Sequence, residues 1–140
     1  MFKYRKSMQQ QDIVFFEWMA KHNAWWDTID FIAPKLMGEY FKQFPEERKK
    51  WVNKWVASDN FWLERCAILF QLKYKQETDL GLLADIIQKL SSSEEFFIRK
   101  AIGWVLREYA KTDPVWVRAF VANHELSNLS RREAMKYLCA

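Results

Sequence analysis

The segment Trp25-Trp26-Asp27-Thr28-Ile29-Asp30 places its second tryptophan and its final aspartate one helical turn apart, because positions i and i+4 share one face of an α-helix. The position of Asp30 then recurs along the chain. Arg65 follows 35 residues later, Lys100 after another 35, and Arg132 after 32 more. A period of about 33 to 47 residues is typical of stacked helical hairpins, in which equivalent positions line one wall. We therefore expect a wall that carries one acid and three bases.

The composition predicts a single domain over residues 1–140, since a chain of this length buries about two-thirds of its unfolded surface. Half of the residues are hydrophobic, and 8 Trp, 11 Phe and 5 Tyr are many for 140 residues. Lys and Arg number 22 against 18 Asp and Glu, so the net charge of +4 permits an anionic partner without requiring one.

Cys66 and Cys139 lie far apart in apolar helical segments, which predicts two reduced thiols rather than a disulfide. The sequence has neither a run of 18 apolar residues nor a signal peptide, so we expect a cytoplasmic protein that does not bind membranes. His22 and His124 are isolated, and we expect neither a metal site nor a cofactor.

The pattern of apolar residues predicts an all-α protein, because only 3 Gly and 3 Pro interrupt the chain and no stretch alternates as a strand would. We expect about eight helices in four pairs, which form a short α-solenoid of HEAT-like hairpins whose second helices line the concave face. Capping boxes are predicted at Ser92 with Glu95 and at Ser130 with Glu133. The predicted helices cover 11–21, 25–41 with a bend at Pro34, a segment that begins at Pro45, 61–75, 79–90, 96–110, a segment that begins at Pro114, and 130–138.

A basic strip is expected on these inner helices, where Lys100, Trp104 and Arg107 follow i, i+4, i+7 spacing. Such a strip can neutralise the phosphates of a DNA duplex and release counterions. The same pattern is also expected of a solvated basic face on a scaffold that binds proteins, and spacing alone does not separate the two. Gly103 has two interpretations as well, close approach of a phosphodiester or tight helix packing.

A carboxylate at Asp30 is unfavourable beside such a strip unless it performs a task or pairs with Arg65. One task is to stabilise positive charge on a deoxyribose while its base departs, since glycoside cleavage passes through an oxocarbenium-like state. A base that is already cationic leaves without a general acid, so one carboxylate suffices, and indoles can hold the cation. The alternative is that Asp27 and Asp30 only favour the start of a helix.

Four blocks of the sequence, in order, resemble the AlkD-type bacterial DNA alkylation repair enzymes, which are HEAT-like-repeat glycosylases that excise N3- and N7-alkylated purines. The resemblance implies that duplex DNA with alkylated purines is the partner and that the target base is not drawn into a deep pocket. The blocks are AWWDTID (24–30), WVASDNFWLER (55–65), FFIRKAIGWVLREY (96–109) and LSRREA (129–134).

The resemblance also implies the roles of individual residues. The catalytic group would consist of one carboxylate and two indoles, which flank the lesion sugar and backbone: Asp30, Trp26 and Trp104. The DNA backbone contacts would come from basic residues: Arg65, Lys73, Lys100 and Arg107.

Members of that family are longer, so we expect this chain to correspond to the carboxy-terminal part of the family fold, without the amino-terminal repeats. A solenoid that begins mid-array exposes an apolar face, which favours self-association. Two functions stay open: a DNA glycosylase, and a non-catalytic solenoid that binds DNA or protein. The expected apolar face consists of Phe2, Tyr4, Ile13, Val14 and Phe16.

Overall fold

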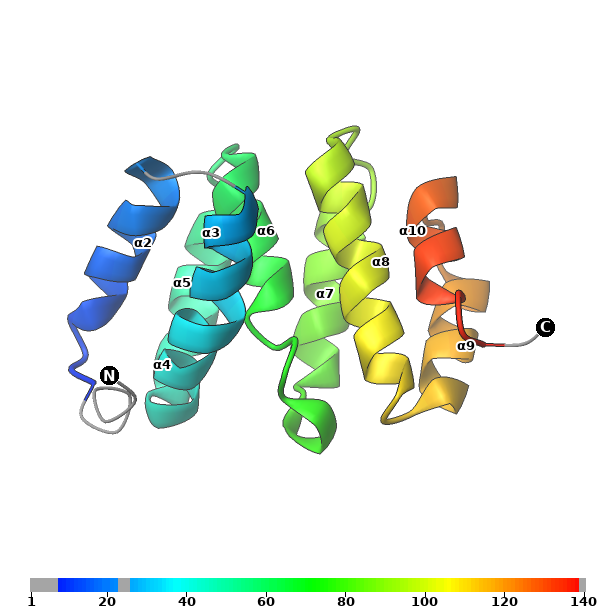
Figure 1. Cartoon of the computed structure of the whole chain (residues 1–140), viewed down its shortest axis with the longest axis horizontal. Helices are drawn as coiled ribbons and strands as arrows, with labels where there is room; N and C mark the ends of the chain where they lie inside the picture. Colours follow the sequence, from blue (N-terminus) through cyan, green and yellow to red (C-terminus); the bar gives the residue numbers. More distant parts are fainter. Residues whose placement is uncertain (1–7, 23–25, 139–140) are drawn as a thin grey trace. The chain divides into compact units, whose positions relative to one another are not determined.

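The computed structural model describes residues 8–22 and 26–138, with the backbone alone described at Trp26 and Asp27. All regular secondary structure in these ranges is helical, which confirms the all-α prediction (Figure 1). The elements are α2 (Asp12–His22), α3 (Trp26–Phe31), η1 (Ile32–Met37), α4 (Gly38–Gln43), η2 (Pro45–Glu47), α5 (Arg48–Val56), α6 (Phe61–Leu69), η3 (Lys75–Glu77), α7 (Leu80–Leu90), α8 (Phe96–Ala110), α9 (Pro114–Asn123) and α10 (Asn128–Ala134).

The helix number agrees with the prediction. Since α3, η1 and α4 follow one another without interruption, they form one helix, and the described residues then hold eight helices besides short 3₁₀ turns. The helices group into two compact units, 1–70 and 71–140. The expectation of a single domain over 1–140 stays a prediction.

Three helices begin with a side-chain cap. Asn60 accepts hydrogen bonds from the backbone N–H groups of Trp62 and Leu63 at the start of α6. The Asp79 and Asp113 carboxylates each accept one such bond, at the starts of α7 and α9. Each bond satisfies a backbone donor that the first turn of a helix leaves without a partner.

Both predicted capping boxes are wrong. Helix α8 begins after Glu95 without a side-chain cap, and Ser93 accepts a hydrogen bond from the Glu95 backbone N–H instead. Helix α10 begins two residues before Ser130, with Ser127 as its cap. Ser130 is buried and donates to the Arg99 carbonyl at 2.7 Å, so it joins α10 to α8.

The predicted bend at Pro34 is accommodated by a π-helical segment, η1, which contains the proline. Proline lacks a backbone N–H and its ring clashes with the carbonyl of residue i−4, which here is Asp30. The wider π turn relieves that clash without ending the helix, and π turns are frequent at functional sites. The π-helical segment thus begins two residues after Asp30.

Helix α6 is the centre of the first unit, where it packs against α2, α3, η1 and α5. It ends at Leu69 rather than at the predicted Lys75, and residues 70–73 form a turn. Large aromatic side chains fill the space beside it: Phe41 contacts Trp55 and Phe70 edge to face, with ring centroids 5.9 and 4.9 Å apart. Trp51 and Trp55 are buried in the first unit.

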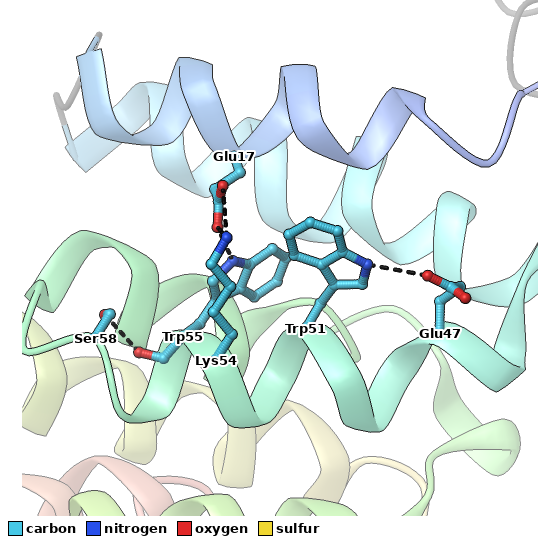
Figure 2. A network of polar contacts seen from close by, with 6 residues as sticks. All are labelled: Glu17, Glu47, Trp51, Lys54, Trp55 and Ser58. Carbon is cyan, nitrogen blue, oxygen red and sulfur yellow. Dashed lines mark hydrogen bonds and ion pairs between the residues drawn. The ribbon is translucent and has the colours of Figure 1, made fainter.

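A buried carboxylate joins α2 to α5 in the first unit (Figure 2). Glu17 accepts a hydrogen bond from the Trp55 indole at 2.9 Å and forms an ion pair with Lys54 at 3.1 Å. On the same helix, the Trp51 indole donates to Glu47 at 3.1 Å. Since a buried indole N–H needs an acceptor, Glu17 fixes how α2 rests on α5.

The exposed face of α2 differs from the predicted one. Ile13 and Phe16 are buried against the first unit, so their expected exposure is wrong. Val14 is exposed as predicted, and the other exposed large apolar residues of α2 are Phe15 and Trp18. Phe2 and Tyr4 lie outside the described residues, and self-association stays a prediction.

The second unit is organised around α8, which packs along α10 and against α9 (Figure 1). Its apolar face supplies Ile98, Ala101, Ile102, Val105 and Leu106, all buried. Across the described residues, every helix is too short or too polar to span a bilayer.

Replacing Glu17 by alanine should lower the free energy of unfolding by about 1–3 kcal/mol, because the Trp55 indole N–H would stay buried without its acceptor. Lys54→Ala is the matched control. Its ammonium group is exposed and the indole still donates to Glu17 in this variant, so the loss should be smaller than that of Glu17→Ala. Urea unfolding followed by tryptophan fluorescence measures both. Equal losses in the two variants would contradict the assignment of Glu17 to the indole.

Candidate active site

An ion pair in the first unit brings two of the predicted site residues together. Arg65, on α6, donates from Nε to Asp30 Oδ1 at 2.9 Å and from Nη2 to Oδ2 at 3.2 Å. The planar guanidinium therefore engages both oxygens of the carboxylate, the strongest geometry for this type of pair. These two hydrogen bonds fix the orientation of the Asp30 carboxylate.

The two partners differ in exposure. The Arg65 side chain is only 4% exposed, whereas that of Asp30 is 18% exposed. The carboxylate is therefore more accessible to solvent or to a ligand than the guanidinium is. A direct phosphate contact by Arg65 would require this pair to open.

Cys66 is buried beside this pair. Burial raises the pKa of the Cys66 thiol well above its usual range, the nearby Asp30 carboxylate raises it further, and Arg65 acts in the opposite direction. The thiol is therefore protonated at neutral pH and serves as a small apolar group. The interior around the ion pair is apolar, which strengthens the attraction between its two charges.

A second charge cluster lies in the second unit, on the predicted basic strip of α8. Glu133, from α10, contacts Arg107 Nη1 at 2.7 Å and Lys100 Nζ at 3.5 Å. One carboxylate thus links two cations that are seven residues apart on the same helix. The sequence predicts the two cations, but it assigns Glu133 to a capping box, and this interpretation is wrong.

Gly103 makes room for that carboxylate. A Cβ atom at this position would lie 2.5 Å from Glu133 Cβ and 3.1 Å from the Ser130 carbonyl oxygen. Real Cβ atoms essentially never come as close as 2.5 Å to another atom, so α10 can lie this close to α8 only because residue 103 has no side chain. The packing interpretation of Gly103 therefore accounts for this position.

For the remaining predicted site residues, the structure gives position and exposure. Trp26 begins α3, and its side chain lies outside the described part of the chain. Trp104 is half-buried on α8, one turn from Lys100. Lys73 is exposed in the turn after α6, and Arg132 is exposed on α10. Among the described residues, no three His, Cys, Asp or Glu side chains gather as metal ligands.

A pocket of about 470 Å³ in the second unit holds none of the predicted site residues. Its wall includes Tyr109, whose pKa is raised by burial and, less strongly, by Asp113. Tyr109 is therefore a neutral hydroxyl at physiological pH. The charged residues Lys75, Lys111 and Glu108 also line the pocket.

Comparison with known proteins identifies similar chains. The family model for DNA alkylation repair enzymes matches residues 1–138. A solved structure of a predicted DNA alkylation repair enzyme from Enterococcus faecalis is similar, with a TM-score of 0.87 and 36% sequence identity. The match covers 96% of this chain and 63% of that chain, so the present chain spans less than two-thirds of that relative. No match was found among curated protein sequences.

Replacing Arg65 by methionine should lower the free energy of unfolding by about 2–4 kcal/mol. Removing one partner of a buried pair leaves the other charge poorly solvated, and the partial exposure of Asp30 reduces that cost. Lys89→Met, which breaks the exposed pair with Asp85, is the control and should cost less than about 1 kcal/mol. Urea denaturation measures both variants. An Arg65→Met protein as stable as its parent would show that the pair contributes nothing to stability.

Replacing Gly103 by alanine should destabilise the protein by about 1–3 kcal/mol, because the new methyl group pushes α10 away from α8. That loss exceeds the gain in helix propensity, which is about 1 kcal/mol at most. Gly81→Ala is the matched control, since its Cβ would lie an ordinary 3.7 Å from Asp79 Oδ1 on α7. The melting temperature, measured by thermal unfolding, should rise or stay unchanged for Gly81→Ala and should fall for Gly103→Ala. A rise for both would remove the packing argument.

Proposed function

Because this chain belongs to the DNA alkylation repair enzyme family, we propose that it is a DNA glycosylase that removes N3- and N7-alkylated purines from duplex DNA. The observation that carries the proposal is the Asp30 carboxylate. Two N–H groups of buried Arg65 fix its orientation, while part of it stays exposed. A fixed carboxylate with an open edge is what stabilisation of a developing positive charge requires.

The proposed reaction breaks the bond between C1′ of the deoxyribose and the purine nitrogen. The electron pair of that bond moves to the purine, which neutralises the positive charge of the alkylated base and lets it leave without protonation. The sugar becomes oxocarbenium-like, and the Asp30 carboxylate stabilises it directly or through a positioned water. Water then adds to C1′ and releases a proton, which leaves an abasic site.

Arg65 acts in this scheme as a positioning residue. Its guanidinium occupies the buried side of the carboxylate and leaves the exposed side for the substrate. A carboxylate that was free to rotate would lose part of its interaction energy to reorganisation as charge develops, so preorganisation favours the transition state.

DNA binding is assigned in this proposal to the basic residues of the second unit. Lys100 is 42% exposed and Arg107 23% exposed, and Lys73 is exposed in the turn after α6. Each can approach a phosphate oxygen, which accepts hydrogen bonds from Lys or Arg. Trp104 and Trp26 are proposed to contact the lesion sugar and backbone, the roles that the resemblance implies.

A second candidate is a non-catalytic module that binds DNA or protein. The Asp30–Arg65 pair favours it, because an acid that neutralises a buried base has a structural role without any chemistry. The two candidates differ in one measurable respect, since only the first releases a free base.

Asp30→Asn should reduce release of 7-methylguanine from methylated duplex DNA by about 100-fold or more, because the neutral amide cannot stabilise an oxocarbenium-like sugar. Binding to the same duplex should stay within about threefold of the parent, since the oxygen of the new amide still accepts a hydrogen bond from Arg65. Chromatography of the released bases and fluorescence anisotropy measure the two quantities.

Asp85→Asn is the matched control, since it removes the same charge from the exposed surface of α7. It should release base at the rate of the parent. Undiminished release by Asp30→Asn would exclude the carboxylate from the mechanism. DNA binding by the parent without any base release would favour the non-catalytic candidate.

A further inference from the structure

We propose that Glu133 regulates DNA binding by occupying, in the free protein, the cations of α8 that bind phosphate in the complex. The carboxylate takes the place of a phosphate between Lys100 and Arg107 and lowers affinity for undamaged duplex. This inference rests on the proposed function, because it concerns the DNA-binding surface of the same protein.

The geometry of Glu133 differs from that of an ordinary surface ion pair. Its two oxygens contact different cations of α8, Oε1 with Arg107 Nη1 at 2.7 Å and Oε2 with Lys100 Nζ at 3.5 Å. The side chain of Glu133 is only 15% exposed, so it is held in place. An anionic oxygen group between two cations has the charge pattern of a bound phosphodiester.

Gly103 makes this placement specific. The stem of Glu133 crosses α8 at the glycine, which lies between Lys100 and Arg107 in sequence. A side chain at position 103 would prevent the stem from lying there. The position of the carboxylate is therefore set by backbone packing and does not depend on the cations alone.

The two cations differ in how easily they can exchange partners. Lys100 is the more exposed and makes the longer contact, whereas Arg107 is less exposed and makes a short, charge-assisted hydrogen bond. An incoming phosphate therefore recruits Lys100 first, and Arg107 stays with Glu133 for longer. The net charge of the three groups is +1 rather than +2, so Glu133 cancels one of the two charges that attract DNA.

The test is binding of Glu133→Gln to an undamaged duplex, measured by fluorescence anisotropy over a series of salt concentrations. Glutamine keeps the shape and an acceptor for Arg107 but removes the charge. Because the contact that a phosphate displaces first is with the exposed Lys100 and is therefore weak, affinity should rise by about two- to fivefold at low salt. The slope of log K against log salt should steepen by about 0.9, which is the effect of one further neutralised phosphate.

Glu108→Gln is the matched control. It removes the same charge from α8, where Glu108 pairs with Lys111 rather than with the strip. The DNA affinity of Glu108→Gln should differ from that of the parent by less than the DNA affinity of Glu133→Gln does. In a background in which Lys100 and Arg107 are both replaced by methionine, Glu133→Gln should no longer raise affinity, because the effect acts through those cations.

Glu133→Met is a second variant for the case that Glu133→Gln does not fold. Methionine keeps an unbranched stem that can cross Gly103 and removes the charge, so this variant should also bind DNA more tightly than the parent. Thermal unfolding checks that each variant is folded. Unchanged or weaker binding by both variants would overturn the inference, as would an equal gain in Glu108→Gln. These outcomes differ from failure of the proposed function, which appears as absence of base release by the parent. Absence of DNA binding by parent and variants alike would overturn both.

Discussion

The buried guanidinium of Arg65 imposes the constraint on which the candidate site depends. A charge placed in an apolar interior needs a partner of opposite sign, and the Asp30 carboxylate supplies that charge through two hydrogen bonds. The pair ties α3 to α6, the central helix of the first unit. The orientation of the candidate catalytic carboxylate is thus a consequence of how the interior is neutralised.

The sequence predicts most helices because these depend on local signals. The limits of α8 follow from its apolar spacing, and Asp113 before a proline marks the start of α9. The repeat places Asp30 and Arg65 at equivalent positions, but it does not indicate how deeply either side chain is buried. The apolar residues that surround Arg65 in α6 were the available signal that its side chain is buried.

Two misassigned segments show where a sequence pattern is insufficient. Helix α2 is apolar on several sides, so periodicity does not decide which face is buried, and the buried Glu17 is explained only by the Trp55 indole across from it. Ser130 and Glu133 have capping-box spacing, but the helix starts earlier at Ser127. Ser130 and Glu133 instead make contacts between α10 and α8. Such contacts depend on how two segments that are far apart in sequence pack together.

The two carboxylate sites differ in whether their cations can exchange partners. The Arg65 side chain is only 4% exposed, so its pair with Asp30 is shielded from solvent, and the carboxylate is held in one orientation. Lys100 is exposed, so its contact with Glu133 can be replaced by one with a phosphate at little cost in solvation. The two carboxylates are about equally exposed, so burial of the partner cation is what separates the proposed catalytic carboxylate from the one proposed to compete with DNA.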